Sequence, residues 1–277
     1  MLCIIKIENL YIFDTMNKII SFLICSIMFF SICAKERFHI NEGDNKEDKI
    51  ALVILNGFGD SKKNRKIQLM YFKDKGMDVY IPKYKVRKSL SLSIDKFSKF
   101  YSDHELIKYK EVYFLCYIIG GYVLNEFILK NGTKNIKKVI YDRSPTQERA
   151  AKVGVDRLSL LSKLIYGKIL FDFSKVTLKN LEKNKEFSVG VIIENQATSL
   201  MRYFEKYSYK YGKYSFEIND INSNNNDYFH TWLDHDLMYR RFDVIGKEIL
   251  HFYKYNHFSD LAKREKYNWN PFKKVRL

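Results

Sequence analysis

The sequence predicts an α/β fold with a mostly parallel sheet of about six strands and helices on both faces. Short runs of β-branched and apolar residues alternate with segments that have apolar residues at helical spacing. The run that ends at Leu55 is continuously apolar and rich in β-branched residues, which is typical of a strand covered on both faces. With 277 residues, of which 46% are hydrophobic, the chain is long enough to bury one sizeable core.

The predicted strands and helices alternate along the chain, so right-handed crossovers between parallel strands are expected. Strands are expected at residues 49–55, 77–81, 111–117, 136–142, 187–194 and 214–218. Helices are expected at residues 61–76, 91–101, 120–130, 198–211 and 235–255. Residues 146–185 contain two helical patterns and no strand pattern, so we expect a small helical lid inserted after the fourth strand.

The chain divides into four segments by composition. Residues 1–34 form a leader, and residues 35–48 are polar and are expected to be a tether. Residues 49–257 form the α/β domain with its lid, and residues 258–277 form a basic C-terminal tail. One folded domain is therefore expected.

The leader resembles a bacterial export signal. A short cationic region after Met16 precedes an apolar run that is too short for a comfortable transmembrane span. Met16 is an alternative start to Met1. Cys33 resembles the lipid-modified cysteine of bacterial lipoproteins, although Ile32 is a poor match to the small residue usual before it. We expect an exported protein, either periplasmic, secreted or anchored as a lipoprotein, with an uncleaved membrane anchor as the alternative.

The net charge of +16 would suit an anionic membrane or a cell-wall surface. The lysines are scattered along the chain, and Lys, Asn, Ile, Tyr and Phe are abundant together, as an AT-rich coding sequence produces without selection for a ligand. No nucleic-acid partner is expected, because the tyrosines at residues 203–211 fall on different helix faces. Of the four cysteines only Cys116 lies in the domain body, so no disulfide framework is expected.

Functional residues are expected at the carboxyl ends of the parallel strands. The sharpest pattern lies after the third strand, where residues 116–120 align with the nucleophile elbow G-x-S-x-G. Cys116 stands at the first glycine, Ile118 at the serine and Gly120 at the last glycine. Isoleucine has no atom that attacks a carbonyl, so Ile118 is not a competent nucleophile.

Residues 49–255 resemble the α/β-hydrolase superfamily, in particular its lipase and esterase type. The resemblance rests on the glycine-containing loop at residues 56–59, the elbow, and the segment around His235 before the last helix. It implies that His235 is the catalytic base. It also implies that the backbone N–H groups of Phe58 and Ile119 form the oxyanion hole.

The chain departs from the family pattern in two of the three catalytic roles. Ile118 removes the nucleophile, and the acid position after the fifth strand falls on Thr198. Asp142, at the end of the fourth strand, is the alternative acid. Cys116 and Ser144 are weaker substitutes for the nucleophile, because Cys116 is expected to point into the core and Ser144 lacks an elbow.

The leading hypothesis is an exported α/β-hydrolase-fold protein that is catalytically silent and binds a lipid, an ester or an envelope partner. One alternative is an active lipase or esterase that uses an atypical nucleophile with His235. Another is a basic module that binds an anionic membrane or cell-wall surface. No cofactor is expected, since the loop at residues 57–59 is too short for a dinucleotide fingerprint. No metal is expected from His230, Asp234 and His235, since no second cluster completes a site.

Overall fold

The computed structural model describes residues 35–43, 45–177 and 186–274. The predicted leader, the lipidation candidate Cys33 and residues 178–185 of the predicted lid lie outside this part. Across the described residues, the helices are too short or too polar to cross a lipid bilayer.

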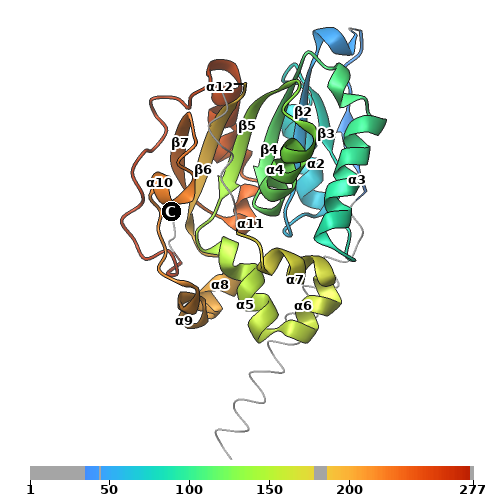
Figure 1. Cartoon of the computed structure of the whole chain (residues 1–277). Helices are drawn as coiled ribbons and strands as arrows, with labels where there is room; N and C mark the ends of the chain where they lie inside the picture. The colour runs from blue at the N-terminus through green and yellow to red at the C-terminus, as the bar shows by residue number, and fades with distance from the viewer. Residues whose placement is uncertain (1–34, 44, 178–185, 275–277) are drawn as a thin grey trace, which may run out of the picture.

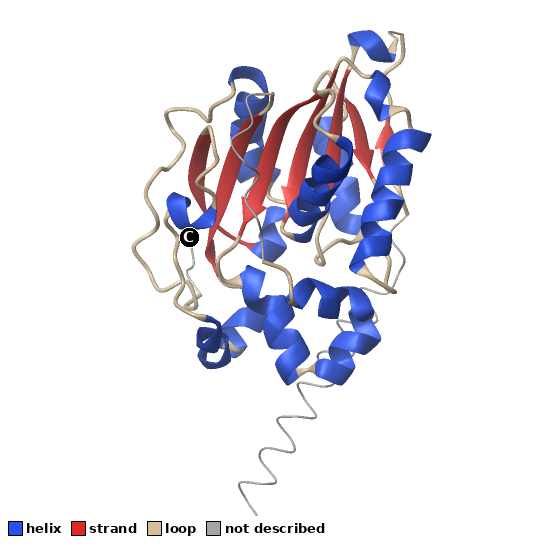
Figure 2. Ribbon diagram, in the orientation of Figure 1, coloured by secondary structure: helices blue, strands red, loops and turns tan. Residues whose placement is uncertain are grey.

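A seven-stranded sheet forms the centre of the molecule, with the strand order β1-β3-β2-β4-β5-β6-β7. Six strands are parallel, and β1 pairs antiparallel with β3 at one edge. The bounds are β1 (Arg37–His39), β2 (Ile50–Leu55), β3 (Asp78–Ile81), β4 (Glu111–Tyr117), β5 (Ile136–Arg143), β6 (Ser188–Gln196) and β7 (Asp227–Asp234). The predicted α/β fold class is confirmed (Figure 2).

Helices cover both faces of the sheet (Figure 1). The helices α3 (Leu90–Asp103) and α4 (Ile119–Asn131) bury Phe97, Phe127 and Val123 against one face. On the other face, α2 (Lys62–Phe72) and α12 (Phe242–Tyr255) bury a second cluster that includes Phe72 and Ile245. Continuously apolar strands such as β2 follow from this double cover, because both of their faces contact protein.

The observed strands differ from the predicted strands at both ends of the domain. The predicted tether contributes β1, whose backbone pairs with β3. The strand predicted at residues 214–218 is absent from the described structure. The last strand is β7, which leads directly to His235 and pairs with β6. Its pattern Asp-Tyr-Phe-His-Thr-Trp-Leu-Asp mixes polar and aromatic residues, which hid a strand at the sheet edge.

Some helices predicted as continuous are divided into shorter helices in the structure. The predicted helix at residues 198–211 consists of α8 (Ser199–Tyr203), α9 (Glu205–Ser208) and η4 (Tyr209–Tyr211). The predicted last helix begins with the short α11 (His235–Met238), which is separate from α12. The lid segment contains α5 (Ala150–Arg157), α6 (Ser159–Tyr166) and α7 (Lys168–Ser174). The remaining short helices are η1 (Lys46–Asp48), η2 (Leu106–Lys108), η3 (Gln147–Arg149) and α10 (Ile218–Ile221).

The described part of the basic tail packs against the edge of the domain. The Trp269 indole N–H donates to the Asn195 carbonyl oxygen at 3.0 Å. The Ala197 N–H donates to the Pro271 carbonyl oxygen at 2.9 Å, and Phe272 is buried in a small cluster with Met201. The tail therefore supports the backbone that follows β6.

Candidate active site

The carboxyl ends of the parallel strands meet at one edge of the sheet, beside the helices α5 to α7 (Figure 1). β2 ends in the loop at residues 56–59, β4 ends at the elbow, and β7 ends at His235. The topology therefore brings the separately predicted segments to one place, as expected for an open parallel sheet.

The elbow keeps a strained backbone without a nucleophile. Ile118 has φ 20° and ψ −83°, a conformation that β-branched residues rarely adopt. The turn passes close to β2, because a Cβ on Gly120 would overlap the carbonyl oxygen of Leu55. The sequence thus preserves the sharp strand-to-helix turn, while its apex carries an aliphatic side chain that is only 7% exposed.

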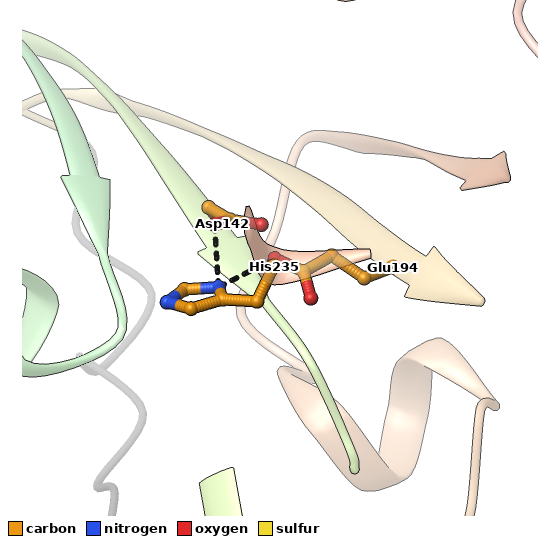
Figure 3. Close-up of side chains that lie close together, drawn as sticks. All are labelled: Asp142, Glu194 and His235. Carbon is orange, nitrogen blue, oxygen red and sulfur yellow. Dashed lines mark hydrogen bonds and ion pairs between the residues drawn. The ribbon is translucent and has the colours of Figure 1, made fainter. Parts of the chain in front are cut away.

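His235 is the first residue of α11, and both of its ring nitrogens have side-chain partners. Figure 3 shows the two carboxyl groups that face one of these nitrogens. Its Nδ1 lies 2.7 Å from Glu194 Oε1 and 3.5 Å from Asp142 Oδ2. Its Nε2 lies 3.1 Å from the Tyr239 hydroxyl. The ring is therefore oriented by two carboxyl groups on one side and one phenol on the other.

The two carboxyl groups come from neighbouring strands and share one face of the sheet. Asp142 of β5 pairs with Ile192 of β6, so Glu194 lies two residues further along β6. Because side chains alternate between faces with a period of two, Asp142, Ile192 and Glu194 point the same way. Both carboxyl groups have no exposed surface. Three of their oxygens, both of Asp142 and Oε2 of Glu194, have no hydrogen-bond partner among the described residues.

The pKa values of this cluster reflect burial and crowding of charge. Burial raises the pKa of Glu194 well above its usual range, and the neighbouring Asp142 charge raises it further. Burial by itself lowers the pKa of His235, but the attraction of Glu194 and Asp142 outweighs it, so the pKa of His235 is raised well above its usual range. Glu194 and His235 therefore both favour their protonated forms in this buried site.

Tyr239 fills the space between the imidazole and the loop after β2. Its ring stacks on Tyr117 with centroids 4.2 Å apart. A Cβ on Gly57 would lie 2.6 Å from the Tyr239 hydroxyl, and one on Gly59 would lie 2.7 Å from the ring. The loop therefore needs glycine at both positions to accommodate this buried ring. Burial also raises the pKa of Tyr239 well above its usual value.

The lid covers the elbow with aromatic side chains. The Phe58 ring makes edge contacts with Tyr166 of α6 at 5.1 Å and Phe173 of α7 at 5.9 Å between centroids. Phe173 also contacts Tyr122, in the first turns of α4. These contacts between the lid, the loop after β2 and the start of α4 are aromatic.

Three solved structures are similar to this chain over most of its length. Lipase BlEst2 from Bacillus licheniformis has a TM-score of 0.54 at 13% identity, covering 80% of this chain and 97% of that one. The bromoperoxidase from Bacillus anthracis has a TM-score of 0.52 at 15% identity, covering 79% and 94%. A lipase-esterase related protein from Clostridium acetobutylicum has a TM-score of 0.50 at 17% identity, covering 79% and 97%. No family model and no curated protein matches the sequence.

The chain has the α/β-hydrolase fold. Ile118, Asp142, Glu194 and His235 lie at or just after the carboxyl ends of the neighbouring strands β4, β5, β6 and β7. Ile119 is the first residue of α4, so its N–H is among the helix donors that lack a partner within the helix. Phe58 lies in the loop after β2. The oxyanion-hole roles of Phe58 and Ile119 stay predictions.

The other candidate residues of this α/β-hydrolase-fold chain have structural partners. Thr198, the expected acid position, caps α8 and donates its hydroxyl to Gln147 at 2.8 Å. Ser144 is buried beside Thr146 and accepts the Gln147 N–H. The Cys116 thiol is buried on the sheet face opposite Tyr117, and burial raises its pKa. A thiol of this kind is not an activated nucleophile.

The contacts of two residues with His235 were not predicted from the sequence. Glu194, rather than Thr198, contacts the histidine, and Tyr239 occupies the other ring nitrogen. The sequence contains a feature that could have indicated each contact. Glu194 directly follows the apolar run Val-Gly-Val-Ile-Ile of a predicted buried strand, and charged residues are rarely buried without a partner. Tyr239 follows His235 by four residues, a spacing at which helical side chains meet.

His230, one of the three residues considered as metal ligands in the sequence, accepts a hydrogen bond from the Asn195 side-chain amide through its Nδ1 at 3.0 Å. A different set of side chains gathers around His235. Its potential ligand atoms, from Asp142, Glu194 and His235, all lie within 4.8 Å of one another.

Proposed function

We propose that this chain is an α/β-hydrolase-fold protein that has lost serine-type ester hydrolysis and acts by binding a lipid or ester ligand beneath its lid. The observation that carries the proposal is Ile118 at the strained apex of the elbow. No proton transfer from His235 creates a nucleophile on an aliphatic side chain. A catalytic triad without its nucleophile loses nearly all turnover by that route.

The hydrogen bonding of His235 supports the same proposal. Its Nε2, the nitrogen that faces the nucleophile in this fold, is bonded to the Tyr239 phenol. The lid adds apolar cover through Tyr166 and Phe173, which contact Phe58. An acyl chain suits such a surface, because apolar and aromatic side chains line most small-molecule sites. Entry of a ligand would require these rings to separate.

Ligand binding is tested with a fluorescent long-chain fatty acid. We expect saturable binding that Phe58→Ala weakens about tenfold, because this variant removes the ring that joins the loop to the lid. Leu261→Ala is the matched control, since Leu261 is 94% exposed on the tail. Equal affinity in wild type and the Phe58 variant, or no saturable binding, would count against a site beneath the lid.

Tyr239 gives the one specific reason for a second candidate, an active acyl hydrolase with an atypical nucleophile. Its hydroxyl lies 3.1 Å from His235 Nε2, and Nδ1 contacts Glu194, so the three groups form a relay of the triad type. Three features oppose this function. The ring has no exposed surface, it stacks on Tyr117, and its pKa is raised by burial, which disfavours the phenolate.

Ester hydrolysis separates the two candidates. Purified protein is assayed on short p-nitrophenyl esters beside His235→Ala and Tyr239→Phe. The silent-scaffold proposal expects the same background rate in all three proteins. A rate that falls tenfold or more in both variants, with covalent labelling of Tyr239 by a fluorophosphonate, would establish the hydrolase instead.

A further inference from the structure

We infer that Asp142, Glu194 and His235 form a buried site for a divalent transition-metal ion such as Zn²⁺ or Mn²⁺. This inference goes beyond the proposed function, since a silent scaffold binds ligand with or without a metal. The first observation is proximity. One ligand atom from each residue lies within 4.8 Å of the others, and the three residues come from β5, β6 and α11 at one strand edge.

The second observation is the set of unpartnered oxygens. Both oxygens of Asp142 and Oε2 of Glu194 are buried, and they accept no hydrogen bond from the described residues. Buried carboxyl oxygens without donors are costly, because burial removes their hydration. The single imidazole ring offers Nδ1 alone to two carboxyl groups. A divalent cation that displaced the protons of the cluster would satisfy the remaining lone pairs and balance the charges of both carboxylates.

The distances fit tetrahedral coordination after a small adjustment. Metal–nitrogen and metal–oxygen bonds of about 2.1 Å place neighbouring ligands about 3.4 Å apart. Nδ1 and Asp142 Oδ2 are separated by 3.5 Å, which matches. Nδ1 and Glu194 Oε1 are 2.7 Å apart, so that hydrogen bond would open by about 0.7 Å to admit an ion. The second oxygen of either carboxyl group supplies a further ligand.

Tyr239 suits the outer shell of such a site. A metal-bound histidine usually donates its other ring N–H to a fixed acceptor, which sets the tautomer and the ring orientation. Here Nε2 lies 3.1 Å from the Tyr239 hydroxyl, and the phenol ring is fixed by its stack on Tyr117. Nδ1 then remains free to coordinate. One nitrogen with two carboxylates favours Zn²⁺ or Mn²⁺ over Mg²⁺ and Ca²⁺, which prefer oxygen ligands alone.

The experiment measures metal content directly. Full-length protein is unfolded and refolded with Zn²⁺ or Mn²⁺ present, since the site is closed to solvent in the folded chain. After desalting, bound metal is measured by mass spectrometry and affinity by calorimetry. We expect about one equivalent per chain in wild type, and at least tenfold weaker binding in Asp142→Asn and Glu194→Gln, which preserve side-chain shape.

Two further measurements keep the result interpretable. His251→Ala is the control for surface binding, because the His251 and His257 rings lie 5.0 Å apart on the outside of the molecule. Co²⁺ refolding adds an absorption spectrum that reports coordination rather than stability. Folded variants that keep the full metal content, metal lost only in His251→Ala, or a wild-type protein that binds none would each overturn the inference.

Discussion

The elbow and the surroundings of His235 differ in what each region provides. At the elbow the backbone remains, with the strained φ of Ile118 and the close passage of Gly120 against β2, but the reactive atom is absent. At the histidine end the side-chain chemistry is present in excess, with two carboxyl groups around one imidazole. The backbone shape is fixed by the packing of the sheet, whereas catalysis depends on single side-chain atoms. The shape can therefore remain where the catalytic atoms are absent.

The largest effect is expected from Gly120→Ala, which would break the elbow itself. The new Cβ would overlap the Leu55 carbonyl oxygen, so β2 and α4 would have to separate. We expect a loss of about 3 kcal/mol in the free energy of unfolding, measured by denaturant titration. Gly154→Ala is the control, because its Cβ would meet side-chain atoms alone, the Ser162 hydroxyl at 3.1 Å and Leu170 Cδ2 at 3.8 Å. Equal losses in the two variants would contradict a special role for the elbow.

Ile118→Ser tests the difference between the elbow and the histidine region, because it places a hydroxyl group at the apex of the elbow. The strained turn would present the new hydroxyl toward His235, so we expect esterase activity roughly a hundredfold above background, measured with a chelator present. Adding His235→Ala should abolish the gain. Adding Tyr239→Phe should increase it, because Nε2 is then released from the phenol. No gain in any combination would mean that the two ends of the site are no longer aligned.

The two carboxyl groups are expected to contribute unequally. Glu194→Gln removes a 2.7 Å charge-assisted hydrogen bond and should cost about 2 kcal/mol of stability. Asp142→Asn relieves repulsion between the carboxyl groups and should cost less than about 1 kcal/mol. Chemical denaturation of both variants without metal checks the ranking. The reverse order would identify Asp142 as the main partner of the histidine.

The smallest effect concerns His230, outside the cluster. Burial lowers the pKa of His230 from 6.5 to about 4; Lys263 and Lys266 lower it further, whereas Glu217 and Glu265 oppose the shift. In the unfolded chain His230 therefore binds a proton below about pH 6.5, whereas in the folded chain it binds one only below about pH 4. Stability from this group is present above pH 6.5 and is lost as pH falls. Between pH 6.5 and 5.5 the loss is about 1 kcal/mol.

The check on His230 compares the pH dependence of unfolding in wild type and His230→Gln. The variant lacks the titrating ring, so its stability should fall less steeply over this interval. Identical slopes would show that the ring titrates in the same range in the folded and unfolded chains.

Local patterns were sufficient for most of the parallel sheet. The runs at β2 and β4 are apolar at nearly every position, the run at β5 has the apolar centre Val-Ile-Tyr, and the structure places strands at all three. The edge strands β1 and β7 were missed, because edge strands contact protein on fewer sides and therefore carry polar residues. The burial of Cys116 followed from its strand position alone.

By itself the sequence determined the fold class, the position of the elbow, the loss of its serine and the histidine before the last helix, because each depends on residues adjacent in the chain. Only the tertiary structure decided that Glu194 joins Asp142 at the imidazole and that Tyr239 takes the opposite nitrogen. These contacts depend on strand register and on the direction in which α11 leaves β7. Both are set by packing between distant segments, which no local pattern records.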